Sequence, residues 1–154
     1  MAAEPVLNPT PIIRALQGAF ARGARRDELL RIAATRIRAV GPPYTGVYLY
    51  MLRNGELVLE AHDGRETEHT RIPVGKGLCG QAVQERRDLY ASDVTAAPGY
   101  LACSLDTRSE LIVLIRRHQE ILGQIDIDSD VPAGFNKTEH AAVKEVADAL
   151  AALL

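Results

Sequence analysis

The sequence is poor in cysteine and in aromatic residues, and it has no long apolar segment. Its 154 residues include two cysteines and no tryptophan, and aromatic residues make up 5%. No apolar run approaches the roughly 20 residues that a membrane-spanning helix needs, so we expect no membrane association. The N-terminal stretch MAAEPVLNPTP has neither the basic nor the apolar region of a secretory signal, which makes the cytoplasm the expected compartment. Cysteines there are normally reduced, and a disulfide that forms there is usually catalytic or sensory.

An excess of basic residues is also lacking. The formal net charge is −2, and the one basic cluster that stands out is ARGARR at residues 21–26. Proteins that bind nucleic acid usually carry a basic surface, so we expect no nucleic-acid partner. We interpret the cluster as the solvated end of one helix and the start of the next.

What the sequence does contain is the composition of an ordinary globular protein, with 47% hydrophobic and 25% charged residues. Its length suggests a single core. We expect residues 1–10 to form an N-terminal arm and residues 11–154 to form one domain. Pro11 is a favourable first residue for a helix. Asp27 is a candidate cap for a second helix, which ends at the GPP stretch of residues 41–43.

A further helix is predicted at the C-terminal end, in HAAVKEVADALAALL. Asn136 and Glu139 resemble a capping box ahead of it. Its apolar residues form one stripe, which consists of Val143, Val146, Ala147, Leu150 and Leu154. The stripe is suited to packing inside the domain, and it also permits a homodimer that uses the terminal helices.

Between these helices the hydrophobic period changes to the alternation of strands. Two strands flank Asn54-Gly55, a dipeptide typical of tight hairpin turns. A second hairpin is predicted for ELIVLIRR and ILGQIDIDSD, at residues 110–117 and 121–130. Because hairpins dominate, the predicted fold class is α+β. We expect a largely antiparallel central sheet of about six strands, with the N- and C-terminal helices packed on one face.

Three acidic residues fall on the second hairpin. Alternation places Gln124, Asp126 and Asp128 on one face of their strand, and Glu110 begins the preceding strand. If the two strands pair, Glu110 lies near the aspartates. One interpretation is an ordinary solvated face of the sheet, without a functional role. The other is a pocket that binds an ammonium group. In such a pocket, mutual repulsion raises the pKa of at least one acid and leaves a proton donor near neutral pH.

The two cysteines occur in different settings. Cys103 lies in TAAPGYLACSLDTR, an irregular segment that we expect to be an active-site or ligand-binding loop. Cys79 lies in GKGLCGQAV, where glycines lead into a helix whose positive dipole end would lower the pKa of the thiol. The alternative is a small buried residue on the inner face of that helix. Zinc held by both cysteines and His69 is disfavoured by the lack of a CxxC pair, so we expect no metal.

Two tyrosines flank Gly46 at the start of the first predicted strand. Because Tyr44 and Tyr48 are four residues apart, we expect their rings to share one face of the sheet. They form either an aromatic wall of a binding site or part of the core.

Together these stretches resemble a known family, the free methionine-(R)-sulfoxide reductases, which are single GAF domains. The resemblance rests on RIPVGKGLCGQAV (71–83), SDV (92–94), GYLAC (99–103), SEL (109–111) and LGQIDIDS (122–129), followed by a phenylalanine before the last helix. It covers roughly residues 27–154. It implies a GAF-like fold for the domain.

The resemblance also implies the chemistry of the cysteines. Cys103 corresponds to the cysteine that attacks the sulfoxide sulfur and becomes a sulfenic acid. Cys79 corresponds to a resolving cysteine, which forms a disulfide with Cys103 that thioredoxin or a similar dithiol reduces. No metal or organic cofactor is implied.

The remaining candidates correspond to residues that hold the substrate, free methionine sulfoxide. Glu110, Asp126 and Asp128 match acids that bind its amino group and assist protonation of the sulfoxide oxygen. Tyr48 matches an aromatic residue of the methyl-binding pocket, and Tyr44 falls where that pocket usually has tryptophan.

One departure from the family pattern concerns a third cysteine, which many members carry ten residues before the position of Cys79. His69 stands there in this sequence. With two thiols, either Cys79 resolves Cys103 directly or an external thiol does so. The alternative function is a non-catalytic GAF module that binds a small ligand or senses oxidants through the two cysteines.

Overall fold

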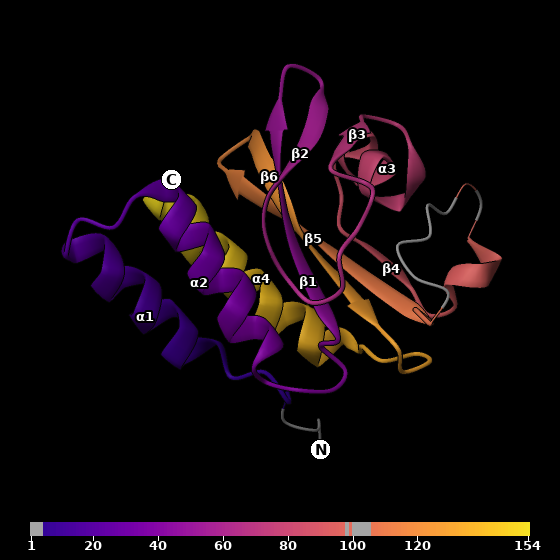
Figure 1. Ribbon diagram of the computed structural model, residues 1–154, viewed down its shortest axis with the longest axis horizontal. Helices are drawn as coiled ribbons and strands as arrows, with labels where there is room; N and C mark the ends of the chain where they lie inside the picture. The colour runs from indigo at the N-terminus through magenta and orange to yellow at the C-terminus, as the bar shows by residue number, and fades with distance from the viewer. Residues whose placement is uncertain (1–4, 98, 100–105) are drawn as a thin grey trace.

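The computed structural model describes residues 5–97, 99 and 106–154 of the chain, and it is built around one antiparallel sheet (Figure 1). The spatial order of its six strands is β3-β2-β1-β6-β5-β4. The strands are β1 (Gly46–Arg53), β2 (Glu56–Asp63), β3 (Arg71–Pro73), β4 (Leu89–Ala91), β5 (Ser109–Arg117) and β6 (Glu120–Ser129). Both predicted hairpins, β1–β2 and β5–β6, are present. The predicted α+β fold with an antiparallel sheet is therefore confirmed.

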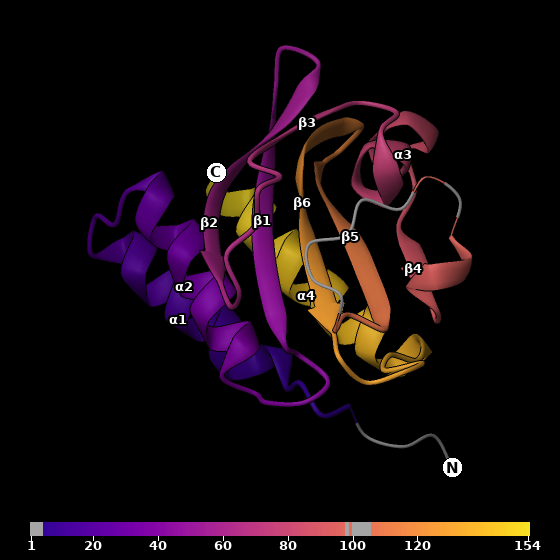
Figure 2. The same ribbon diagram turned by 45° about the vertical axis from the view of Figure 1, so that its right-hand side comes forward.

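Three helices lie on one side of the sheet (Figure 2), where two pack against the strands and the N-terminal one packs on those two. They are α1 (Pro9–Ala21), α2 (Arg26–Arg38) and α4 (Lys137–Leu153). Their apolar sides pack with alternate residues of the strands, including Val47, Leu49 and Ile125, in one core cluster. The prediction that the N- and C-terminal helices share a face is thus confirmed. No helix among the described residues is long and apolar enough to cross a bilayer.

The apolar stripe of α4 belongs to this core. Val143, Val146, Ala147 and Leu150 have no exposed surface. Their apolar area is already removed from water within one chain, which is the main source of their contribution to stability. These four residues are therefore not available to a homodimer, because the core of the same chain covers them, and a homodimer that uses other surfaces stays a prediction.

The opposite face of the sheet carries the short helix α3 (Gly77–Glu85). Tyr48 and Tyr50 of β1 point to this side and pack with Cys79 of α3 in a second, smaller cluster. Strand alternation explains the division, because neighbouring residues of β1 point to opposite faces. Asn54 and Gly55 have φ values of 50° and 82°, as the tight turn between β1 and β2 requires.

The helix starts differ from those predicted. Helix α1 begins at Pro9 rather than Pro11, with Asn8 as its cap. Helix α2 begins at Arg26 with Arg25 at the cap position, so the prediction that Asp27 caps it is wrong. Asp27 lies in the first turn instead, where a negative charge still interacts favourably with the helix dipole.

The N-terminal arm is anchored in its described part. Leu7 is fully buried, and the backbone N–H groups of Val6 and Leu7 donate to the Glu139 carboxylate at 2.7 and 3.2 Å. Asn136 caps α4 by accepting from the Glu139 N–H. The Glu139 side chain bonds to the arm and to the Tyr44 hydroxyl instead of capping α4, so only one half of the predicted capping box forms.

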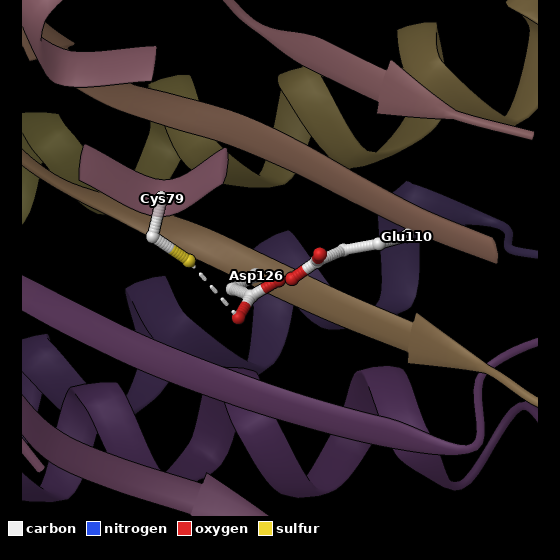
Figure 3. A group of neighbouring side chains, drawn as sticks. All are labelled: Cys79, Glu110 and Asp126. Atoms are coloured by element: carbon white, nitrogen blue, oxygen red, sulfur yellow. Dashed lines mark hydrogen bonds between the residues drawn. The ribbon is translucent and has the colours of Figure 1, made fainter. Parts of the chain in front are cut away.

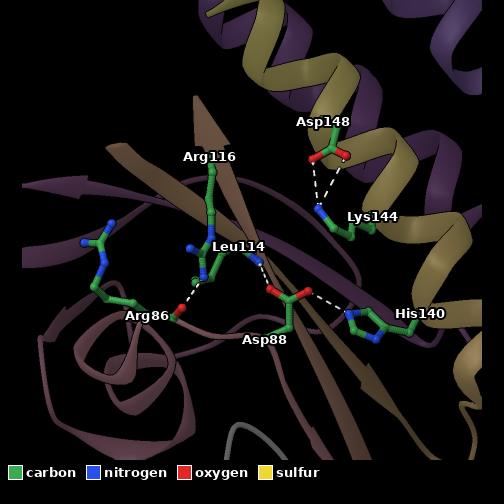
Figure 4. Close-up of polar contacts among 7 residues, drawn as sticks. All are labelled: Arg86, Asp88, Leu114, Arg116, His140, Lys144 and Asp148. Carbon is green, nitrogen blue, oxygen red and sulfur yellow. Dashed lines mark hydrogen bonds and ion pairs between the residues drawn. The ribbon is translucent and has the colours of Figure 1, made fainter. Parts of the chain in front are cut away.

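The edge strand β4 is tied to the helical layer through Asp88 (Figure 4). One carboxylate oxygen of Asp88 accepts from the Leu114 N–H at 2.8 Å, and the other lies 2.6 Å from His140 Nε2 on α4. On the same edge, the Arg116 guanidinium donates to the Arg86 carbonyl. These contacts hold the edge of β5 in place, and β5 carries Glu110.

Candidate active site

The acids of β5 and β6 form one cluster on the face opposite the three helices. In the antiparallel register Glu110 lies opposite Asp128, and Asp126 lies opposite Ile112. The prediction that Asp126, Asp128 and Glu110 lie together is confirmed as geometry. The solvated alternative is wrong, because the exposed fractions are 4% for Glu110, 1% for Asp126 and 4% for Asp128.

The neighbouring strand β1 completes this surface. Tyr48 lies opposite Asp126, and Gly46 lies opposite Asp128. A side chain at Gly46 would meet the Tyr48 ring, because an added Cβ atom would lie 3.0 Å from the ring carbon Cε2. Glycine at this position therefore leaves the space beside Asp128 to the tyrosine ring.

Cys79 approaches the acids from α3 (Figure 3). Its Sγ donates to Asp126 Oδ2 at 3.2 Å, and its carbonyl accepts from Gln124 Nε2 at 3.0 Å. The glycine-rich turn allows this placement, since a Cβ atom at Gly80 would lie 2.6 Å from the Pro73 carbonyl oxygen. Only glycine therefore fits at position 80, where α3 packs closely against the chain after β3.

The Cys79 thiol has a raised pKa. Burial is the main cause, and the negative charges of Asp126 and Glu110 add to it. The prediction that the helix dipole lowers this pKa is wrong, because the fractional charge of a helix end is outweighed by burial and full carboxylate charges. Cys79 is therefore a protonated hydrogen-bond donor, as the alternative of a small buried residue implied.

The two aspartates also have raised pKa values. Burial is the largest cause for both, and for Asp128 the charge of Asp126 adds to it. Hydrogen bonds with Glu110 lower both pKa values in part, and the positive charge of Arg65 lowers that of Asp128. The cluster can hence keep a proton at a pH where an exposed aspartate has none.

The segment between β2 and β3 closes over the tyrosines. The hydroxyl groups of Tyr48 and Tyr50 donate to the carbonyls of Arg65 and His69, each at 2.6 Å. The Tyr48 ring stacks on His62 with ring centroids 5.7 Å apart. The sequence analysis did not identify Arg65 or Tyr50 as neighbours of the site. Tyr50 could have been found from its alternation with Tyr48, whereas nothing in the local sequence pattern marks Arg65.

Arg65 fastens this segment to the chain after β6. Its guanidinium makes two contacts with the Asp130 carboxylate, one of them 2.8 Å long. Asp130 follows Asp128 by two residues, so the ion pair places a positive charge beside the acid cluster.

Tyr44 does not lie at this cluster. Strand β1 begins at Gly46, and Tyr44 lies in the preceding turn, with its N–H bonded to the Gly41 carbonyl. Its ring belongs to the core under the helices, and its hydroxyl donates to Glu139 at 2.6 Å. The prediction that Tyr44 and Tyr48 share a face is wrong, because strand alternation does not extend into the turn. The assignment of Tyr44 to substrate binding loses its structural basis.

Cys103, the cysteine expected to attack the sulfoxide sulfur, lies outside the described residues. Among the residues that the structure does describe, Cys79 is grouped with Glu110 and Asp126, whose ligand atoms all lie within 4.8 Å of one another. His69 is not part of this group. Zinc coordination by His69 and Cys79 thus gains no support from the described part of the chain.

Comparison with known proteins identifies the class to which this fold and site belong. A sequence model of the GAF domain matches residues 23–154. The chain therefore belongs to the GAF domain family. The match leaves α1 outside, so the extension of the domain to residue 11 stays a prediction.

Within that family the chain is similar to free methionine-R-sulfoxide reductases. The enzyme of Escherichia coli is 32% identical over 97 residues, which is 63% of this chain and 58% of that protein. The solved structure of the type II enzyme from Thermoplasma acidophilum is 38% identical, with a TM-score of 0.79 over 84% of this chain and 94% of that one. That of the Neisseria meningitidis enzyme in complex with its substrate is 27% identical, with a TM-score of 0.87 over 99% and 92%.

The chain spans less than two thirds of the length of each curated protein that it matches in sequence.

Proposed function

We propose that this protein reduces free L-methionine-(R)-sulfoxide to methionine, with a thiol as the source of electrons. The observation that carries the proposal is the buried cluster of Glu110, Asp126 and Asp128 next to Cys79. Relatives named for this activity, one of them solved with its substrate, support it. The preference for the R epimer rests on those relatives.

The acids account for recognition of a free amino acid. Asp126 Oδ1 and Asp128 Oδ1 are buried, and neither has a hydrogen-bond partner. Buried oxygens without a partner are costly, so a cationic donor that reaches them gains a large interaction energy. The ammonium group of a free amino acid is such a donor. The nitrogen of a peptide-bound methionine is an uncharged amide and gains much less.

The reaction needs a nucleophile and a proton. In the proposed sequence the Cys103 thiolate attacks the sulfoxide sulfur, and an acid of raised pKa in the cluster protonates the oxygen. The oxygen is transferred to sulfur, which leaves methionine and a sulfenic acid on Cys103. The substrate is thereby reduced by two electrons, and Cys103 is oxidised by two.

Recycling requires a second thiol. In the proposal Cys79 condenses with the sulfenic acid, releasing water and forming the Cys79–Cys103 disulfide. Thioredoxin or a similar dithiol then reduces the disulfide by exchange, in a reducing compartment such as the cytoplasm. A bound ammonium group would assist, because its positive charge offsets the carboxylates that raise the Cys79 pKa.

The function is tested by NADPH consumption with thioredoxin and its reductase. Free methionine-R-sulfoxide, the S epimer and a peptide-bound sulfoxide are offered in parallel, with Cys103→Ser as the control. Turnover of the free R form alone, lost in the control, is the expected result. No turnover of any substrate, with dithiothreitol as well, would contradict the proposal and favour the non-catalytic GAF module.

A further inference from the structure

The acid cluster contains a group that ammonium recognition does not need, the Cys79 thiol. Its Sγ, one carboxylate oxygen of Glu110 and one of Asp126 lie within 4.8 Å of one another, and Figure 3 shows the Cys79 and Glu110 side chains extending toward Asp126. We propose that these three residues, together with Asp128, form a binding site for a thiophilic divalent cation of the Zn²⁺ class. The cation and the ammonium group of the substrate exclude each other there.

The spacing of the ligand atoms suits such an ion. Zinc binds thiolate sulfur at about 2.3 Å and carboxylate oxygen at about 2.0 Å, which in a tetrahedral site puts the two ligand atoms about 3.5 Å apart. Cys79 Sγ and Asp126 Oδ2 are already 3.2 Å apart. The third ligand atom, on Glu110, lies within the 4.8 Å limit and needs only a small side-chain movement.

A second observation points to a ligand at this place. Asp126 Oδ1 and Asp128 Oδ1 have no hydrogen-bond partner, although both residues are buried, with exposed fractions of only 1% for Asp126 and 4% for Asp128. Asp128 lies directly opposite Glu110 in the strand register, on the same face of the sheet. A cation in the group of Cys79, Glu110 and Asp126 would satisfy the Asp126 oxygen that the protein leaves open, and in the proposal the open oxygen of Asp128 is a fourth ligand.

The ligand set selects the class of cation. Mg²⁺ and Ca²⁺ bind oxygen ligands, whereas a cysteine sulfur favours softer ions such as Zn²⁺. The sulfur is also held in place, because Gln124 Nε2 donates to the Cys79 carbonyl at 3.0 Å. Coordination forms a metal–sulfur bond and releases the thiol proton to solvent, without oxidation of any group.

The consequence for activity rests on the proposed function. A cation at this site occupies the carboxylates that would hold the substrate's ammonium group. It also engages the thiol that would resolve the sulfenic acid. Zinc-class ions would therefore inhibit both substrate binding and recycling, and methionine sulfoxide would protect the enzyme from them.

The test is a titration of the reduced full-length protein with Co²⁺, which shows a thiolate-to-cobalt charge-transfer band when a cysteine binds it. We expect one equivalent to bind with this band, and Zn²⁺ to displace it. Cys79→Ser should abolish the band, and Asp126→Asn should weaken binding by at least about tenfold. Cys103→Ser should retain the band, and Asp148→Asn, a control at an exposed acid of α4 paired with Lys144, should bind Co²⁺ as the wild type does.

Two results would overturn the metal site. One is the absence of the band in the wild type, and the other is a band that survives Cys79→Ser. Thermal denaturation of Cys79→Ser and Asp126→Asn verifies that these variants are folded. The failure of the proposed function is separable, because Co²⁺ binding is read without turnover. If Co²⁺ binds through Cys79 but methionine sulfoxide does not displace it, the metal site stands and the shared ammonium site is contradicted.

Discussion

Two regions of the molecule bury carboxyl groups, and they treat them differently. At the start of α4, the Glu139 carboxylate accepts from the N–H groups of Val6 and Leu7 and from the Tyr44 hydroxyl. On β6, Asp126 and Asp128 are equally buried, yet each has an oxygen without a partner. A buried carboxylate whose hydrogen bonds are complete is a structural element. One with an open oxygen and a raised pKa is prepared for a ligand at the expense of stability.

The largest effect on stability is expected from Glu139→Ala. The substitution leaves two backbone N–H groups and the Tyr44 hydroxyl without their acceptor in a buried place. We expect a loss of about 3 kcal/mol in the free energy of unfolding, which corresponds to a fall in Tm of roughly 9 °C for a domain of this size. Thermal and urea denaturation measure it. Glu145→Ala, at an exposed position of the same helix, is the control and should change little.

Asp128→Asn should raise the free energy of unfolding, whereas Glu139→Ala lowers it. Removing a buried charge with an open oxygen should stabilise the folded protein at neutral pH by about 1.5 kcal/mol, while substrate binding is lost. The raised pKa of Asp128 fixes the pH dependence. The folded protein holds a proton that the unfolded chain has already released, so wild-type stability falls as pH rises through this window.

The advantage of Asp128→Asn over the wild type should therefore be small at pH 4 and grow toward pH 7.5. Paired thermal denaturation curves at the two pH values measure it. An advantage that shrinks as pH rises would contradict a raised pKa for Asp128.

A smaller effect separates the two tyrosines. Tyr44→Phe removes a hydrogen bond to Glu139 and should cost about 1 kcal/mol of stability without a change in KM. Tyr48→Phe releases the Arg65 carbonyl beside the acid cluster and should raise KM several-fold. Steady-state kinetics and thermal denaturation of both variants measure this pair. A raised KM for Tyr44→Phe alone would return Tyr44 to the site.

The smallest effect on stability is expected from Arg65→Gln. Its ion pair with Asp130 is partly exposed, with 42% and 34% of the side chains accessible, so the loss should be about 0.5 kcal/mol or less. The Asp128 pKa should rise further, since Arg65 lowers it in the wild type. Arg71→Gln, which removes an exposed pair with Glu56, is the matched control. Equal pH profiles of activity for both variants would show that Arg65 does not act on the cluster.

The sequence predicted those features that depend on local periodicity. The alternation of residues 124–128 and the hairpin of β5 and β6 placed Glu110, Asp126 and Asp128 together, as the structure confirms. The prediction was wrong for Tyr44, because the alternation of the strand was assumed to continue into the turn before Gly46, where β1 begins.

Two other features depend on packing between distant segments. The raised pKa of Cys79 comes from the burial of α3 against β6, 47 residues away in sequence, and no local pattern reports it. The place of Arg65 depends equally on Asp130, 65 residues later. Neither contact can be deduced from spacing alone.

The most direct test of an ammonium site in the acid cluster is a binding measurement on the inactive Cys103→Ser variant. Calorimetry compares free methionine-R-sulfoxide with its N-acetylated form, in which an uncharged amide with an acetyl group replaces the ammonium group. Because a buried charge pair that loses one partner costs several kcal/mol, we predict that acetylation weakens binding by about 100-fold or more. Equal affinity for the two compounds would show that the open oxygens of Asp126 and Asp128 do not bind the amino group.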